Sequence, residues 1–241
     1  MNEHILSRYG ALVDHPDLLW DVAQRPLPTC IWVNRRKTSD SAVRDALEAN
    51  GIYLDAVDWW PGAFRTQHWP KPGETIPYRM GWYLVQEEIA MTAIYALDPQ
   101  PTDTVLDMCA APGNKTVQIA ARLGSSGFVV ANERNTGRLS SLWSSIARMG
   151  MTNVATVHGD GRHLPLPNHL FDRVLVDVPC SGEGTLRKQL KRDWSVDHTM
   201  KAIARLVPIQ QQLLSRALDL VKPGGVVVYS TCTFAPEENE A

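Results

Sequence analysis

From residue 104 onward, the chain alternates short apolar runs with segments that favour helices, and this alternation constrains the fold more than any other feature. The runs are TVLDM, GFVVAN, NVATVH, FDRVLVDV and GVVVYS. They carry little polar alternation, as is typical of parallel strands with helices covering both faces. We expect helices over about 115–123, 136–149 and 208–221 between them. The pattern predicts a doubly wound, mostly parallel α/β sheet.

The first eighty residues predict a smaller α+β module. CIWVN at 30–34 and IYLDAVDWW at 52–60 favour strands, and the segment between them favours a helix that Ser39 or Asp40 caps and Gly51 ends. Prolines and glycines between residues 60 and 80 predict a linker. A helix is expected from Leu84, with one apolar face that includes Val85 and Leu97.

We therefore expect two domains, residues 1–80 and 81–241. The composition, with 44% hydrophobic and 21% charged residues, is that of a globular protein. Neither a membrane-spanning apolar run nor a secretory signal is visible, so we expect a cytoplasmic protein. The four cysteines lack the paired spacing of a zinc site, so no metal is expected. A net charge of -2 gives no general reason to expect a nucleic-acid partner.

Ligands of such sheets bind beyond the carboxyl ends of the strands. The first strand ends in DMCAAPGNKT, where Ala110, Ala111 and Gly113 allow a ligand close to the backbone, and the next helix offers free amides to a carboxylate or phosphate. A turn of small residues made only for packing is the alternative. The segment matches neither the dinucleotide glycine pattern nor a Walker loop.

Two acidic residues follow the next two strands. Glu133 lies where a carboxylate accepts hydrogen bonds from ribose hydroxyls, although a solvated surface charge is the alternative. Asp160, in HGDGR, accepts a hydrogen bond from an adenine amine or caps a turn. The residues alone leave this choice open.

Two cysteines follow the last two strands, Cys180 in DVPCSGEGT and Cys232 in YSTCT. One such cysteine could be merely a small buried apolar residue. That role poorly explains a pair of cysteines flanked by Pro, Ser, Gly and Thr. We interpret the pair as nucleophilic chemistry beside a cofactor. Asp177, at the end of the fourth strand, is expected to contact the substrate, with a turn cap as the alternative.

These segments, together with RPLPTCIWVN and YLVQEEIAM upstream, resemble those of the Sun-type RNA cytosine-5 methyltransferases over nearly the whole chain. The resemblance implies a class I methyltransferase fold and S-adenosyl-L-methionine as cofactor. It also implies that Cys232 attacks the base and that Cys180 assists product release, with Asp177 and Lys115 completing the catalytic set. The expected cofactor-binding residues are Cys109, Ala110, Ala111, Pro112, Gly113, Asn114, Lys115, Glu133, Asp160 and Asp177.

The reaction that the resemblance implies gives a reason for the thiol. Carbon 5 of a pyrimidine is too electron-poor to accept a methyl group directly, so a thiolate first adds to carbon 6 and makes carbon 5 nucleophilic. Asp177, bound to the ring nitrogen and amine edge, would stabilise the charge that enters the base.

Within that family the resemblance is greatest to bacterial enzymes that act on small-subunit ribosomal RNA, so we expect RNA as the partner. The alternatives are a transfer RNA cytosine-5 methyltransferase and a non-catalytic RNA-binding or ribosome assembly factor. A DNA methyltransferase is disfavoured because it lacks the STCT element, and a dehydrogenase because the glycine pattern is wrong. A basic run, Arg187, Lys188, Lys191 and Arg192, is expected to hold RNA phosphates or to form a solvated loop.

The chain departs from the family pattern in two places. Trp32, in WVNR, stands where the family usually has the arginine of an R-V-N-T segment. The sequence also stops soon after Cys232, where the family continues with a helix, further strands and an RNA-binding region. We therefore expect a C-terminally truncated domain, and a monomer for the full-length protein.

Overall fold

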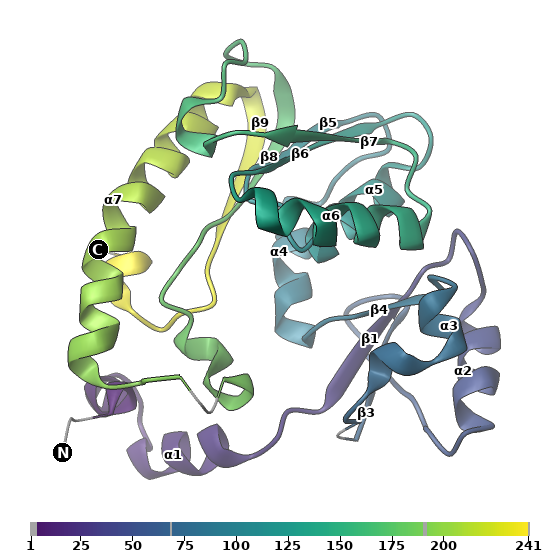
Figure 1. Ribbon diagram of the computed structural model, residues 1–241, viewed down its shortest axis with the longest axis horizontal. Coiled ribbons are helices and arrows are strands. Elements are labelled where there is room, and N and C mark those ends of the chain that lie inside the picture. Colours follow the sequence, from purple (N-terminus) through teal and green to yellow (C-terminus); the bar gives the residue numbers. More distant parts are fainter. Residues whose placement is uncertain (1–3, 68, 190–191, 241) are drawn as a thin grey trace. The chain divides into compact units, whose positions relative to one another are not determined.

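The computed structural model describes residues 4–67, 69–189 and 192–240 (Figure 1). Contacts divide the chain into two compact units. The larger unit consists of residues 28–177 and 216–229, and the smaller unit consists of residues 1–27, 178–215 and 230–241. The predicted division into domains of residues 1–80 and 81–241 stays a prediction.

The larger unit contains a five-stranded sheet with strand order β7-β6-β5-β8-β9. Its strands are β5 (Thr104–Asp107), β6 (Phe128–Glu133), β7 (Val154–His158), β8 (Phe171–Asp177) and β9 (Val221–Ser230). Strands β6 and β7 pair in parallel, and β5 pairs in parallel with both β6 and β8. The predicted doubly wound sheet is confirmed, and all five apolar runs are strands.

The helices that connect these strands also follow the prediction. Helix α5 (Asn114–Leu123) follows β5, and α6 (Thr136–Met149) follows β6. Gly150 ends α6 with φ of 70°, a left-handed conformation that favours glycine. The core of the unit lies between these helices and the sheet, and fully buried side chains from both build it, including Val117, Ile119 and Val129.

A second, antiparallel sheet of the larger unit has the strand order β2-β3-β1-β4. Its strands are β1 (Thr29–Val33), β2 (Asp55–Ala56), β3 (Ala63–Thr66) and β4 (Tyr83–Val85). The predicted helix between the first two strands is α2 (Asp40–Glu48), and the hydroxyl of Ser39 caps it by accepting the amide of Ala42 at 3.2 Å. Two buried side chains of that helix, Val43 and Leu47, pack on this sheet.

Three predictions for this region are wrong. The strand expected over 52–60 is only the two-residue β2, Asp55–Ala56, because a turn that buries Trp60 follows it. The stretch 60–80 is not a linker, because it contains β3 and a short helix, α3 (Ile76–Arg79). The helix expected from Leu84 begins as β4, continues as a 3-10 turn at Glu88–Met91 and becomes α4 only over Thr92–Leu97. The physical reason is strand pairing, because Leu84 pairs with Trp32 of β1 and this pairing overrides the local helical periodicity.

The smaller unit contains α1 (Pro16–Gln24), a 3-10 helix over Ile5–Leu12 and the first part of α7 (Val196–Leu220). Ile5, Leu6, Tyr9 and Trp194 form its apolar cluster. Helix α7 was predicted to begin at Pro208, but it begins at Val196 and holds that proline in its interior. Proline removes only one helical hydrogen bond, so a helix continues through it when the flanking turns pack well.

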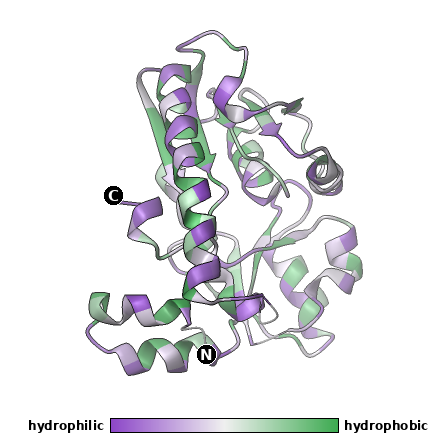
Figure 2. Cartoon of the chain, turned by 60° about the vertical axis from the view of Figure 1, so that its left-hand side comes forward, coloured by the Kyte–Doolittle hydropathy of each residue, from purple (hydrophilic) through white to green (hydrophobic). Residues whose placement is uncertain are grey.

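Figure 2 shows that the helices carry both hydrophilic and hydrophobic residues along their length. This distribution is typical of helices with one buried and one solvent-facing side. In the described part of the chain, every helix is too short or too polar to cross a membrane.

Candidate functional site

The turn after β5 packs closely against α6. Gly113 has φ of 103°, and a Cβ atom built on it would lie 3.0 Å from both Leu142 and Ser145. The turn is held by the amide of Ala110, which donates to the carbonyl of Asn132 at 2.8 Å. Packing therefore accounts for the glycine. The first turn of α5 lacks a side-chain cap, so its amides are suited to an anionic ligand as well.

Glu133 ends β6 and is almost completely buried beside this turn. Its carboxylate accepts the amide of Asn135 at 2.7 Å and the amide of Ala111 at 3.3 Å. The guanidinium of Arg138 lies 3.7 Å from it. The structure thus brings Glu133 to the predicted cofactor turn, and the alternative of a solvated surface charge is wrong.

Asp160 caps the 3-10 turn at Gly161–His163 that follows β7. It accepts the backbone amide of Arg162 at 3.1 Å and the guanidinium of the same residue at 2.6 Å. These hydrogen bonds from Arg162 lower the pKa of Asp160 to about 2. Asp160 therefore caps the turn in the structure, as one of the two predicted roles has it, and its carboxylate is ionised at neutral pH.

Lys115 and Asp177 form an ion pair that sequence reasoning did not predict. The ammonium of Lys115, in the first turn of α5, donates to Asp177 at the end of β8 across 2.8 Å. The lysine is largely buried and the aspartate is half-buried. The pair holds two of the predicted catalytic residues at one edge of the sheet.

Two buried groups lie beneath this edge. Asp107 ends β5 and accepts the hydroxyl of Thr116 at 2.6 Å, and burial raises its pKa to about 7. Burial also raises the pKa of the thiol of Cys109. Because a thiol with a raised pKa stays protonated at neutral pH, Cys109 is unsuited to act as a nucleophile.

In the smaller unit, the structure brings the two other predicted cysteines into contact. The Sγ atoms of Cys180 and Cys232 lie 3.1 Å apart, and the amide of Cys232 donates to Sγ of Cys180 at 3.3 Å. Cys232 is exposed, whereas Cys180 is half-buried. The contact with Cys232, followed by burial, raises the pKa of Cys180.

Two buried glutamates hydrogen-bond to the cysteine loops, which are the segments after β8 and β9 that contain Cys180 and Cys232. Sequence reasoning missed both glutamates. Glu238 is 3% exposed and accepts the amide of Ser181 at 3.0 Å and the side-chain amide of Gln210 at 2.7 Å. Glu183 is 1% exposed and accepts the amide of Phe234 at 3.1 Å. Each glutamate thus links one cysteine loop to the other. The sequence signal that could have found them is a glutamate in each motif that follows a cysteine, GEGT after Cys180 and PEEN after Cys232.

The predicted site residues fall into two groups. Those of the cofactor turn, with Glu133, Asp160 and Asp177, belong to the larger unit, and Cys180 and Cys232 belong to the smaller unit. In the basic run, the guanidinium of Arg192 lies over the ring of Trp194 at 4.5 Å. Lys191 lies outside the described residues.

Comparison with known proteins decides the family. Residues 94–241 match the model of the 16S rRNA methyltransferase RsmB/F family. The chain belongs to the RsmB/F family. Among curated RsmB/F relatives, the ribosomal RNA small subunit methyltransferase F of Aeromonas salmonicida is 41% identical over 231 residues, covering 90% of this chain and 47% of the relative. Its counterpart in Aeromonas hydrophila is 39% identical with the same coverage.

Solved structures support the fold assignment. A methyltransferase homolog protein from Pyrococcus horikoshii is 31% identical with a TM-score of 0.78, over 98% of this chain and 79% of that chain. NSun6 from Pyrococcus horikoshii with SFG is 22% identical with a TM-score of 0.88, over 98% of this chain and 84% of that chain, and it supports the fold alone. The class I fold is confirmed. This RsmB/F chain spans about half the length of the curated relatives that it matches.

Proposed function

We propose that this chain carries the catalytic part of an S-adenosylmethionine-dependent methyltransferase that modifies carbon 5 of a cytosine in small-subunit ribosomal RNA. The observation that carries the proposal is the contact between the thiols of Cys180 and Cys232 at 3.1 Å. Two thiols at this separation can divide the reaction between them, one attacking the base and the other acting near the same atoms during release.

The residues of the larger unit fit the cofactor. The uncapped first turn of α5 suits its carboxylate, the buried Glu133 suits its ribose hydroxyls, and the ionised Asp160 suits its adenine amine. One relative in structure was solved with SFG, an analogue of S-adenosylmethionine. When bound, the cofactor supplies an electrophilic methyl group.

The chain's own residues perform the remaining steps. The thiolate of Cys232 adds to carbon 6 of the cytosine, which forms a sulfur–carbon bond and leaves carbon 5 nucleophilic. Carbon 5 then takes the methyl group and loses its proton to a base. The sulfur–carbon bond breaks and the thiolate of Cys232 is regenerated. The exposure of this thiol supports its role as the attacking group.

Asp177 and Cys180 assist these steps in the proposal. Asp177, held by Lys115 at 2.8 Å, binds the amine edge of the base and stabilises the charge that enters the ring. Cys180 stays protonated because its pKa is raised, so it is unsuited to attack, and its thiol, 3.1 Å from Sγ of Cys232, would hydrogen-bond to that sulfur as the sulfur–carbon bond breaks. In the proposal, Cys232 attacks the base and Cys180 assists the release of the product.

The substrate assignment rests on relatives. Curated relatives about 40% identical to this chain carry the name ribosomal RNA small subunit methyltransferase F. We propose that this chain acts on the same substrate class, small-subunit ribosomal RNA. A transfer RNA substrate is the alternative that the same chemistry would serve, and a non-catalytic assembly factor is the alternative that would not need the two thiols.

The proposal is tested by adduct formation and by mapping of the methylated base. The protein is incubated with small-subunit ribosomal RNA and cofactor, and covalent protein–RNA complexes are resolved on denaturing gels. We expect Cys180→Ala to accumulate adducts and Cys232→Ala to form none. Cys30→Ala, which removes a thiol from β1, serves as the matched control and should retain turnover.

Bisulfite sequencing of the same RNA reads the modified cytosine directly. A single resistant cytosine that disappears with Cys232→Ala supports the reaction. Adducts formed by Cys232→Ala but not by Cys180→Ala would reverse the two roles. A protein that binds the RNA but transfers no methyl group to any cytosine would instead be the assembly factor.

A further inference from the structure

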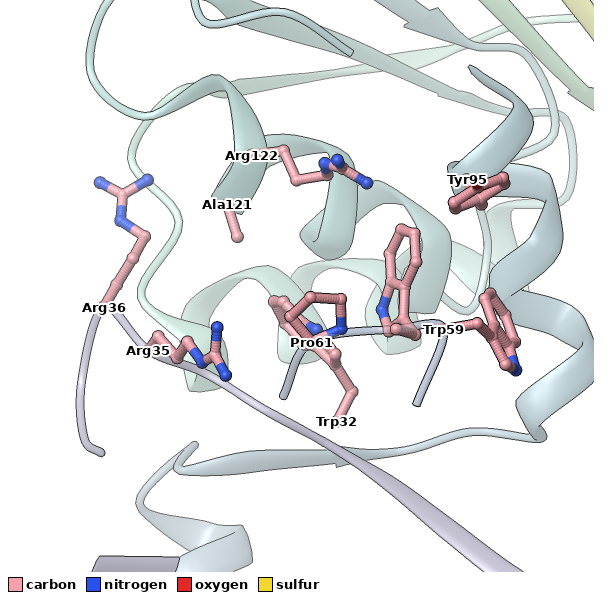
Figure 3. Close-up of a pocket in the computed structure, with 9 residues that line it drawn as sticks. Trp32, Arg35, Arg36, Trp59, Pro61, Tyr95, Ala121 and Arg122 are labelled. Carbon is pink, nitrogen blue, oxygen red and sulfur yellow. The ribbon is translucent and has the colours of Figure 1, made fainter. Parts of the chain in front are cut away.

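A pocket of about 390 Å³ lies within the larger unit, where β1 and the loop after β2 face helices α4 and α5. Figure 3 shows Trp32 and Pro61 on one side of it, Ala121 and Arg122 of α5 on the other and Tyr95 of α4 at its end. Its volume is in the range of small-molecule and cofactor sites, about 300–1,000 Å³. The proposed cofactor turn lies at the opposite end of α5, nine residues and therefore about 13 Å from Arg122 along the helix. The pocket is thus separate from that turn.

Four of the nine residues that line the pocket are aromatic. Trp59, Trp60 and Tyr95 form a cluster in which neighbouring ring centroids lie 5.7 to 6.1 Å apart. Tyr95 is 62% exposed, so a large part of its ring is open to a ligand. Trp32 adds a fourth ring from β1, at the position where the sequence departs from the family's arginine. Flat apolar ligands with a π-face are the chemistry that such a wall accepts.

Three of the other lining residues are arginines. Arg35, Arg36 and Arg122 line the pocket, and no carboxylate does so among the described residues. Arg35 uses its Nε and one Nη for Asp40, at 2.9 and 2.5 Å, and Arg36 uses one Nη for two carbonyls near the end of α5. These bonds engage about two of the five N–H groups that each guanidinium carries. The remaining donors suit an anion such as a phosphate.

One buried donor inside this lining lacks a partner. Trp60 is 4% exposed, and its indole N–H makes no hydrogen bond to any described residue. The guanidinium of Arg122 covers its ring at 4.8 Å. Buried polar groups in folded proteins are nearly always hydrogen-bonded, so an orphan donor in a pocket wall indicates a ligand acceptor. A carbonyl or ring nitrogen of a nucleobase is the kind of acceptor that such a donor binds.

We propose that this pocket binds one unpaired nucleotide of an RNA strand, outside the site of methyl transfer. The aromatic rings stack on the base, the N–H of Trp60 binds an acceptor on its edge, and the arginines at the rim bind its phosphate. A quaternary ammonium ligand would also suit an aromatic wall, but three guanidinium groups repel it. The pocket gives the chain a second point of contact with RNA and so sets which segment it engages.

The proposal shares with the proposed function only the binding of RNA, so it is tested without turnover. The probe is a fluorescein-labelled, ten-nucleotide single-stranded RNA of mixed sequence, and its affinity for the protein is measured by anisotropy. We expect Tyr95→Ala to weaken binding about tenfold, since stacking on one aromatic ring contributes on that order. Tyr95→Phe keeps the ring and should retain the affinity. Tyr53→Ala removes an equally exposed tyrosine outside the pocket and should change nothing.

Salt dependence tests the phosphate contact. Arg122→Ala should weaken binding and reduce the slope of log affinity against log salt by about 0.7, the value for one phosphate contact to a single strand. Arg79→Ala, an exposed arginine outside the pocket, is the control. Unchanged cofactor affinity in every variant verifies that the fold is intact. Adenosine monophosphate serves as a second probe, and binding of this mononucleotide as tightly as the RNA would overturn the assignment to a strand.

Crosslinking locates the nucleotide. The same RNA with one 4-thiouridine is irradiated and the crosslinked peptides are mapped by mass spectrometry, with crosslinks expected on Trp32, Trp59 or Tyr95. Unchanged RNA affinity in both Tyr95→Ala and Arg122→Ala, or crosslinks only elsewhere, would overturn the pocket assignment. If no methyl group is transferred but RNA binding still depends on Tyr95, the proposed reaction is wrong and the proposed nucleotide pocket is supported.

Discussion

The thiols of Cys180 and Cys232 face each other, with their Sγ atoms 3.1 Å apart. The two residues follow neighbouring strands of the parallel sheet, β8 and β9. The backbone strengthens the contact, because the amide of Cys232 donates to the sulfur of Cys180. This arrangement makes the pair a chemical unit, and its reactivity is the first property to measure.

We predict that mild oxidation joins this pair and no other. Diamide, which accepts two electrons and two protons, should convert the two thiols into a disulfide, since only a small shift separates their sulfur atoms from bonding distance. Non-reducing peptide mapping should recover a peptide that links residues 180 and 232, and methyl transfer should stop until dithiothreitol is added. Free alkylation of both cysteines after diamide treatment would contradict the close contact. Cys30, which is buried in β1, provides the internal control.

The buried carboxyl of Asp107 should make stability depend on pH. Burial raises its pKa to about 7 in the folded protein, whereas the value in an unfolded chain is about 3.9. The folded state therefore binds the extra proton between these values. The free energy of unfolding should fall as pH rises from about 4 to about 7, by at most about 1.4 kcal/mol per pH unit, and level off above that.

Asp107→Asn removes this contribution and keeps an acceptor for the hydroxyl of Thr116. Relative to the wild type, the variant should gain stability at pH 8 compared with pH 5 in urea unfolding curves. Asp55→Asn alters an exposed carboxyl of β2 and is the matched control. Equal pH profiles for the wild type and Asp107→Asn would show that this carboxyl is ionised in the folded state.

Removal of the carboxylate of Glu238 should loosen the cysteine loops. Glu238→Ala leaves the amide of Ser181 and the side chain of Gln210 without their acceptor, which costs about 1–3 kcal/mol for a buried polar group. We expect a lower melting temperature and faster alkylation of Cys180 by iodoacetamide. Glu240→Ala, at an exposed position of the same segment, should leave both measurements unchanged. Slow alkylation of Cys180 in Glu238→Ala would mean that other contacts hold the loop.

Glu133, at the end of β6, and Asp160, after β7, should contribute to cofactor binding, whereas a surface glutamate should not. Glu133→Ala and Asp160→Ala are each expected to weaken S-adenosylmethionine binding by about 1–3 kcal/mol, the cost of leaving buried polar partners unpaired. Isothermal titration calorimetry measures the effect, and Glu48→Ala in α2 is the control. Unchanged affinity in both variants would place the cofactor elsewhere.

Local sequence patterns predicted the parallel sheet and its helices well and the N-terminal sheet poorly. Helix α6 has the predicted bounds, because its periodicity and the glycine that ends it are properties of one segment. The segment from Leu84 was predicted as a helix because its local periodicity is helical. It is a strand at its start because Leu84 pairs with Trp32, a residue of a distant segment. The residue pattern of one short segment carries no information about which distant strand will pair with it.

The same contrast holds for the site. Apolar runs and small-residue turns were enough to predict the doubly wound sheet and the chemical groups that follow its strands, from Glu133 to Cys232. The folded chain was needed to show that Lys115 pairs with Asp177, that Glu183 and Glu238 join the two cysteine loops and that Trp32 and Arg122 line one pocket. These contacts join residues far apart in the chain. Their existence depends on how packed elements are juxtaposed, which is set by burial of the whole core and not by any local pattern.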